Sequence, residues 1–183
     1  PGLAPFLEGL AALSADDVRV VLVHGNHDFL AGAELTEALG VEVAPEGLWV
    51  SLGGQRAWLT HGDAFCTGDV GYHRLHAVLR SRPVRWLFAQ LSRASLEAVA
   101  RGLGAGSGKA TAVKPRAVMD IVDGAVARRL ERGADVVVCG HVHQARDSRV
   151  GPGRLVVMAD CETTGSHARF EDGRLELVRE DAA

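Results

Sequence analysis

Four side chains of metal-binding type follow short apolar runs in this sequence. Asn26, His61, His141 and His143 each come just after a stretch of buried-type aliphatic residues. Neutral imidazoles and an amide oxygen are ligands for a borderline divalent cation such as manganese, iron or zinc. Their shared placement predicts a cation site formed by these four residues.

The spacing of the last two histidines adds a geometric expectation. His141 and His143 are two positions apart, and in an extended segment residues at that spacing point to the same side. We therefore expect both imidazoles to face one cation or two adjacent ones. Asp28 and Asp63 lie within two residues of predicted ligands, and we expect these carboxylates to orient imidazole rings rather than to bridge cations.

These residues must be positioned by a mixed set of helices and strands. Hydrophobic periodicity and turn residues predict helices near residues 3–13 and 33–39 and a largely helical region over residues 72–133. The strands are predicted at residues 20–23, 41–44, 48–52, 57–60, 136–138, 155–158, 167–170 and 175–178. Gly53-Gly54 predicts a hairpin turn between strands 48–52 and 57–60, and Asp172-Gly173 predicts one between the last two strands. The order indicates an α/β protein with polar residues at strand ends, where ligands of open α/β sheets bind.

Residues 70–119 differ in charge from the rest of the chain. They contain one acid, Glu97, and nine basic side chains: Arg74, Arg80, Arg82, Arg85, Arg93, Arg101, Lys109, Lys114 and Arg116. Apolar residues at nearly helical spacing accompany them. Basic and apolar residues together suit an anionic lipid or a membrane surface, but a helical hairpin with a solvated basic face has the same composition.

The composition limits the class of protein. A chain of 183 residues with 47% hydrophobic content can bury a core as one domain, residues 1–183, with 70–119 as a helical insertion within it. The net charge of −3 argues against a nucleic-acid-binding protein. Three cysteines without CxxC spacing fit a reducing cytoplasm better than a disulfide framework. The sequence does not indicate an oligomeric state.

The segments "GNHD", "HGD" and "GHVH" resemble the last three motifs of the calcineurin-like metallophosphoesterases. The resemblance implies an α+β sandwich, with two divalent cations bound at strand ends. Asn26, His61 and His141 would bind one cation and His143 the other. Mn²⁺ is the expected metal, with Fe²⁺ or Zn²⁺ as alternatives. His27 and Asp28 are assigned to the catalytic group, His27 because the family uses this histidine on the leaving oxygen.

The segment "HGDAFCTGDVGYHRLHAVLRSRPVRWLF" narrows the resemblance to the UDP-2,3-diacylglucosamine diphosphatases of lipid A synthesis, over roughly residues 20–180. By this resemblance Asp69, Tyr72, Ser107 and Lys114 would contact the sugar and phosphate region of the substrate, and Phe29 an acyl chain. Those diphosphatases usually have arginine where this chain has His27.

The resemblance implies a bacterial hydrolase that cleaves the pyrophosphate of UDP-2,3-diacylglucosamine to UMP and 2,3-diacylglucosamine 1-phosphate. Its substrate would be an anionic lipid nucleotide, with no nucleic-acid partner. It would be cytoplasmic and peripheral on the cytoplasmic face of the inner membrane. Two alternatives remain open: a metallophosphoesterase of other specificity, and a non-catalytic lipid-binding remnant.

Two family motifs, Asp-X-His and Gly-Asp-X-X-Asp, are not found in the sequence. The resemblance places them upstream of Pro1, so we expect the chain to be truncated at its N-terminus. Two cations about 3.5–4 Å apart repel each other and need anionic ligands between them. Four neutral ligands do not supply that charge, so weak cation binding is expected without the missing motifs.

Overall fold

The computed structural model describes residues 4–26, 32–92, 94–96, 98–99, 101–102 and 114–179. These residues divide into two compact units, which are described one at a time. Unit 1 comprises Pro1–Asp63 and Val126–Ala183, and unit 2 comprises Ala64–Ala125. The helical region predicted at residues 70–119 falls within unit 2.

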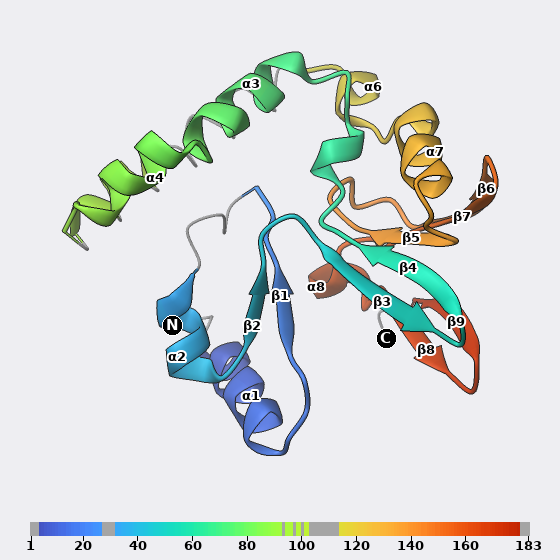
Figure 1. The fold of residues 1–183 in the computed structure, drawn as a ribbon, viewed down its shortest axis with the longest axis horizontal. Coiled ribbons are helices and arrows are strands. Elements are labelled where there is room, and N and C mark those ends of the chain that lie inside the picture. Colours follow the sequence, from blue (N-terminus) through green and yellow to red (C-terminus); the bar gives the residue numbers. More distant parts are fainter. Residues whose placement is uncertain are drawn as a thin grey trace. The chain divides into compact units, whose positions relative to one another are not determined.

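A five-stranded sheet organises unit 1 (Figure 1), with strand order β3-β4-β5-β7-β6. Its strands are β3 (Leu48–Leu52), β4 (Gln55–Leu59), β5 (Val136–Cys139), β6 (Arg146–Val150) and β7 (Gly153–Val157). The three central strands β4, β5 and β7 are parallel, and the two edge strands are antiparallel to their neighbours. The carboxyl ends of the central strands therefore meet at one edge of the sheet.

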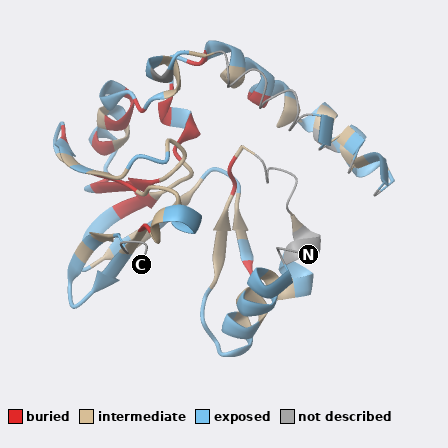
Figure 2. Cartoon of the chain, turned by 180° about the vertical axis from the view of Figure 1, so that it is seen from behind, coloured by how far each residue is buried: buried red, intermediate tan, exposed pale blue. Residues whose placement is uncertain are grey.

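Both faces of this sheet are covered, which explains why β5 (VVVC) is a continuous apolar run and why β4 and β7 are apolar toward their carboxyl ends. On one face Ala57, Val136, Val138 and Val156 pack against Leu175 and Leu177 of the hairpin β8 (His167–Glu171) and β9 (Arg174–Val178). On the other face, Arg129 of α7 (Asp123–Glu131) lies over the ring of Trp58, 4.4 Å from its centroid. The buried residues are concentrated on this sheet and the elements beside it (Figure 2).

A smaller parallel sheet lies earlier in unit 1. It pairs β1 (Val21–Val23) with β2 (Glu42–Ala44). Helix α1 (Ala4–Ala15) precedes β1 in the chain, and α2 (Ala33–Leu39) connects the two strands. Gly40 ends α2 in the left-handed conformation, with φ of 69°. The short helix α8 (Cys161–Thr164) connects β7 to β8.

Unit 2 is helical, and the two ends of its helical segment lie beside each other. It contains η1 (Asp63–Phe65), whose first residue belongs to unit 1, α3 (Val70–Leu79), α4 (Arg82–Ala89) and α6 (Arg116–Met119). The N–H of Val122 donates to the carbonyl of Phe65 at 3.0 Å. A Cβ on Gly68 would lie 2.9 Å from the carbonyl oxygen of Val118, so only glycine allows this approach. The entry and exit of the segment are thus in contact.

The predicted α/β class is confirmed, and both predicted hairpin turns are present. Gly53 and Gly54 have positive φ, as do Asp172 and Gly173, which is the conformation of the tight turns that join twisted antiparallel strands. The strand β6 was not predicted from the sequence, because its residues are mostly polar.

Candidate metal centre

His61 and His141 are brought together by the parallel pairing of β4 with β5. Both histidines follow their strands by two residues, and the ladder continues past the strand ends: the N–H of Thr60 donates to Val138 O at 3.0 Å, and Gly140 N–H donates to His61 O at 2.9 Å. The two imidazole centroids are 4.7 Å apart, with the ring planes at 63°. The predicted convergence of these two side chains is confirmed.

Asp63 lies beside the first of these rings, as expected from the sequence. Its Oδ1 is 3.2 Å from Nδ1 of His61. The Asp63 side chain is 10% exposed and that of His61 is 23% exposed, so the carboxylate is the more enclosed of the two. A neutral His61 that donates from Nδ1 to this carboxylate keeps the lone pair on Nε2 for a cation.

Gly62 allows the close approach of the two strand ends. It has φ of 115°, and a Cβ there would lie 3.1 Å from Gly140 O and 3.2 Å from Cys139 Cβ. Any larger residue would be strained in this conformation and would also press against the end of β5. Gly62 is visible in the sequence as the glycine of "HGD", but its role in the close approach of the two strand ends was not predicted.

The expectation of an extended segment at His141 and His143 is wrong. Both residues have positive φ, 72° and 55°, and Val142 N–H donates to Gly140 O at 2.9 Å. That hydrogen bond closes a γ-turn centred on His141. β5 ends at Cys139, so the alternation of an extended strand no longer governs where these side chains point. Positive φ at a non-glycine residue is a strained state that is often found at functional sites.

Two further residues, Asn26 and His143, were predicted as ligands. Asn26 is half-buried and follows β1, and His143 is exposed. Within the described ranges, no group of three or more His, Cys, Asp or Glu side chains is arranged to hold a metal ion. Asn26 and His143 therefore stay predictions. His27, Asp28, Phe29 and Ser107 lie outside the described residues.

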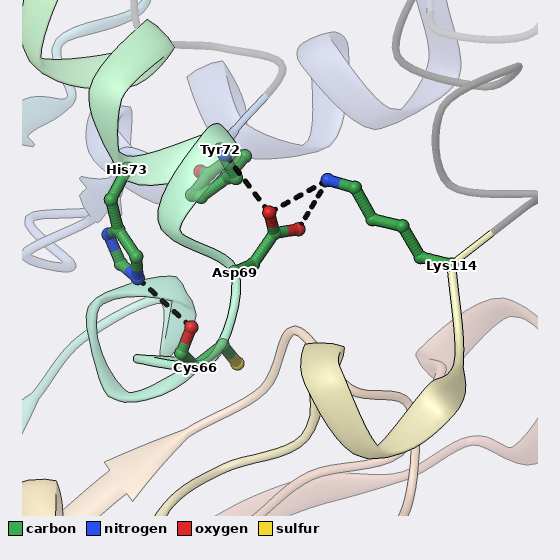
Figure 3. A network of polar contacts seen from close by, with 5 residues as sticks. All are labelled: Cys66, Asp69, Tyr72, His73 and Lys114. Carbon is green, nitrogen blue, oxygen red and sulfur yellow. Dashed lines mark hydrogen bonds and ion pairs between the residues drawn. The ribbon is translucent and has the colours of Figure 1, made fainter.

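Three of the residues predicted to contact substrate meet in unit 2 (Figure 3). Lys114 Nζ donates to both carboxylate oxygens of Asp69, at 2.8 and 2.6 Å, and the N–H of Tyr72 donates to Asp69 Oδ1 at 3.0 Å. Asp69 is thereby the N-cap of α3. His73 donates from Nε2 to the carbonyl of Cys66 at 3.0 Å, which fixes the same turn.

The Asp69 carboxyl is held in its charged form. Burial raises its pKa, but the hydrogen bonds from Lys114 and from the Tyr72 N–H outweigh burial and lower the pKa below its ordinary value. The nearby charges of Lys114 and His73 act in the same direction. From the sequence Asp69 was assigned to substrate and its capping role was not predicted, although an aspartate directly before Val70, the first residue of α3, is a recognisable capping signal.

Comparison with known proteins identifies the relatives of the chain. It is 31% identical over 164 residues to the UDP-2,3-diacylglucosamine hydrolase of Aeromonas hydrophila, covering 87% of this chain and 68% of that protein. The enzyme of the same name from Pseudomonas entomophila is 30% identical over 176 residues, which is 93% of this chain and 73% of the relative. The chain belongs to the UDP-2,3-diacylglucosamine hydrolase family. The resemblance found in the sequence is thereby confirmed.

One more relative carries the same name, whereas the family models and the solved structures add no further assignment. The UDP-2,3-diacylglucosamine hydrolase of Bordetella parapertussis is 35% identical over 161 residues, covering 87% of this chain and 59% of the relative. No family model matches the chain. An archaeal phosphodiesterase aligns over 97% of this chain and 76% of its own, with a TM-score of 0.44 and 12% identity. That score is below 0.5, so we draw no conclusion from this likeness.

None of the helices in the described part of the chain is long and apolar enough to cross a bilayer.

Proposed function

We propose that this chain hydrolyses the pyrophosphate bond of UDP-2,3-diacylglucosamine. Water would add to one phosphorus, the bridging P–O bond would break, and the products would be UMP and 2,3-diacylglucosamine 1-phosphate. The observation that carries the proposal is the adjacent pair His61 and His141 at the ends of parallel strands, in a chain of this family. Two neighbouring imidazoles, one of them hydrogen-bonded to a carboxylate, fit a borderline divalent cation.

Divalent cations, Mn²⁺ in the first instance and Fe²⁺ or Zn²⁺ as alternatives, would supply an activated water and neutralise phosphate oxygens. His61 and His141 would hold a cation, with Asp63 fixing the first ring. Asn26 and His143 are proposed to complete the ligand set. His27 is proposed to stabilise the departing phosphate, with Asp28 beside it in the sequence.

Unit 2 offers the groups proposed to select the substrate. Lys114 carries an ammonium held at 2.6 and 2.8 Å from Asp69, beside Tyr72 at the start of α3. An ammonium of this kind pairs with phosphate as a point charge. We propose that Lys114, Tyr72 and Asp69, together with Ser107, contact the sugar and phosphate region, and that Phe29 contacts an acyl chain.

The exposed apolar side chains of α3 and α4 support contact with lipid. Trp86 is 67% exposed and Leu87 is 53% exposed, within a segment rich in basic residues. Amphipathic helices with tryptophan and basic residues bind the interface of anionic bilayers. We therefore propose a cytoplasmic protein that associates peripherally with the inner membrane, where its anionic lipid-nucleotide substrate resides.

The test is an assay of UMP release from UDP-2,3-diacylglucosamine with Mn²⁺ present. His61→Ala and His141→Ala should each lower turnover at least about 100-fold, because a ligand is lost, while circular dichroism stays unchanged. His167→Ala is the matched control, since His167, the first residue of β8, donates from Nδ1 to the Gly165 carbonyl in the connection from α8. Full activity in either ligand variant would contradict the proposal.

The two alternatives give different results in the same assay. A metallophosphoesterase of other specificity would hydrolyse UDP-glucose or bis(p-nitrophenyl) phosphate at least as well as the lipid nucleotide. A non-catalytic remnant would bind the lipid nucleotide without releasing UMP. Metal content measured on this chain, and on one extended at its N-terminus, separates a remnant from an enzyme that needs further ligands.

A further inference from the structure

Asp63 is enclosed and directed at one nitrogen of a predicted ligand. The residue is 7% exposed, and its Oδ1 lies 3.2 Å from Nδ1 of His61. Gly62, between them, has φ of 115° and packs against Gly140 and Cys139. The packing against the end of β5 therefore fixes the backbone from His61 to Asp63. In this conformation the Asp63 carboxylate lies beside Nδ1 of the His61 ring.

We propose that Asp63 is a positioning residue that holds His61 in the tautomer protonated at Nδ1, so that Nε2 faces the cation. The inference rests on the proposed function and deepens it. A free imidazole exchanges its proton between the two nitrogens, and each exchange would remove the lone pair that the cation needs. A carboxylate at Nδ1 favours one of the two states and raises the basicity of the ligand nitrogen.

A competing arrangement has the same two residues bind the cation directly. Nitrogen and oxygen ligands about 2.0–2.2 Å from a tetrahedral cation are themselves about 3.3 Å apart, close to the observed separation. In that case Nδ1 would carry the cation and Nε2 the proton. Burial favours the positioning role, because the carboxylate is more enclosed than the ring it touches, at 10% against 23% exposure.

The two arrangements differ in which nitrogen of His61 is protonated, which NMR measures directly. The chain is labelled with ¹⁵N, and long-range proton–nitrogen correlations of the imidazoles are recorded without metal at a pH where the rings are neutral. The His61 signals are assigned by their loss in His61→Gln. Asp63→Ala removes the acceptor, whereas Asp63→Asn keeps an oxygen of the same shape and removes the charge.

We expect the wild type to be protonated at Nδ1, Asp63→Ala to show a mixture of both tautomers, and Asp63→Asn to retain the wild-type state. Asp147→Asn, in β6, serves as control and should leave the His61 spectrum unchanged. A wild-type His61 protonated at Nε2, or an Asp63→Ala spectrum equal to the wild type, would overturn the proposal. Circular dichroism of each variant shows that it is folded, and the asparagine variant carries the test if the alanine variant is not.

Titration with Zn²⁺ of the same samples separates this proposal from the proposed function. Asp63→Ala should bind about 10–100-fold more weakly than the wild type, with Asp63→Asn between them. Zn²⁺ bound at Nδ1 of His61 would contradict the positioning role. If neither these samples nor a chain extended at its N-terminus binds Zn²⁺ while the tautomer result holds, the positioning role stands and the metal-dependent function fails.

Discussion

At the scale of single residues, Asp69 has two structural tasks in unit 2. It caps α3 through the Tyr72 N–H, and it forms a two-oxygen ion pair with Lys114, which is 45 residues away in the chain. Because the Asp69 side chain is 11% exposed, removing its partner leaves a poorly solvated charge. The pair therefore contributes to the stability of unit 2 independently of any substrate.

The lowered pKa of Asp69 predicts a pH dependence of stability. A carboxyl whose pKa is lower in the folded than in the unfolded chain stabilises the fold above its unfolded pKa, about 3.9, and loses that contribution as the pH falls through the folded value. We expect the melting temperature to fall below about pH 4. In Asp69→Asn the acid dependence should be weaker. Equal acid sensitivity in both proteins, measured by thermal unfolding, would contradict this role.

A second comparison separates the cap from the ion pair. Asparagine is also a good N-cap, so Asp69→Asn keeps the bond from Tyr72 and removes only the charge. Asp69→Ala removes both, and should lower the free energy of unfolding by about 1–2 kcal/mol more than the asparagine variant. Urea unfolding of both variants measures the difference. A difference near zero would show that the cap is unimportant.

Gly62 gives a prediction for the candidate metal centre. Gly62→Ala should lower the free energy of unfolding by about 2–4 kcal/mol, because the new Cβ meets Gly140 O at 3.1 Å in a conformation that is itself strained. Gly54→Ala is the control: Gly54 also has positive φ, 88°, but a Cβ there meets nothing within 4 Å. A loss in Gly62→Ala no larger than in the control would mean that the close approach is unimportant.

The sequence was sufficient to predict part of this centre. Polar residues after apolar strands predicted that His61 and His141 lie side by side, because parallel strands bring their carboxyl ends to one edge. That these two residues bind a cation stays a prediction. The backbone at His141 could not be read in the same way. The γ-turn depends on a hydrogen bond between Gly140 and Val142, and local periodicity does not report it.

At the scale of elements, the β3–β4 hairpin is attached to α7 through aromatic rings and guanidinium groups. Trp49 and Trp58 are paired across the hairpin, with ring centroids 5.0 Å apart. Arg129 of α7 lies 4.4 Å from the Trp58 centroid, and Arg56 lies 4.7 Å from that of Trp49. The Arg129 contact joins α7 to the hairpin and adds a cation–π component to the burial of Trp58, whereas the Arg56 contact lies within the hairpin itself.

This attachment can be tested on α7. Arg129→Met keeps a long side chain but removes the cation, and should lower the free energy of unfolding by about 0.5–2 kcal/mol. Arg128→Met changes the adjacent residue, which is exposed, and should have little effect. Chemical unfolding of both variants checks the prediction. If both variants lower the free energy of unfolding equally, the contact of Arg129 with the Trp58 ring does not contribute to stability.

The predicted elements agree with the structure where local signals are strong. Both tight turns were located from Gly53-Gly54 and Asp172-Gly173, since these residues adopt positive φ easily. The strand β6 escaped prediction because "RDSRV" has little apolar character. It is held by pairing with β7 and by Arg154, which bonds to both oxygens of Asp147 at 2.8 and 2.6 Å. Such cross-strand contacts are not visible in the sequence of one strand.

At the scale of the whole molecule, charge is distributed unevenly along the chain. Residues 70–119 are strongly basic although the chain as a whole carries −3. The exposed apolar residues of α3 and α4 are Val70, Leu75, Val78, Trp86 and Leu87. Basic charge beside exposed apolar surface favours negatively charged membranes, and salt weakens the electrostatic part of such binding.

Binding to lipid vesicles tests whether this basic and apolar surface contacts membranes. The chain should co-sediment with vesicles that contain anionic lipid, less with zwitterionic vesicles, and less again in high salt. Trp86→Ala should weaken binding about three- to tenfold, since the indole inserts at the interface. Phe6→Ala, at a 58% exposed site in α1, is the control. Equal loss in the two variants would argue against a membrane surface on α4.

The contact between Phe65 and Val122 also bears on how this segment could have been acquired. Two chain positions joined by a 3.0 Å hydrogen bond can be linked by loops of very different length, because the entropy of closing a loop grows only with the logarithm of its length. Exchange of the intervening helices for a foreign segment would leave the junction intact. In such chimaeras the ligand preference would change with the exchanged helices, whereas the strands that precede His61 and His141 would stay the same.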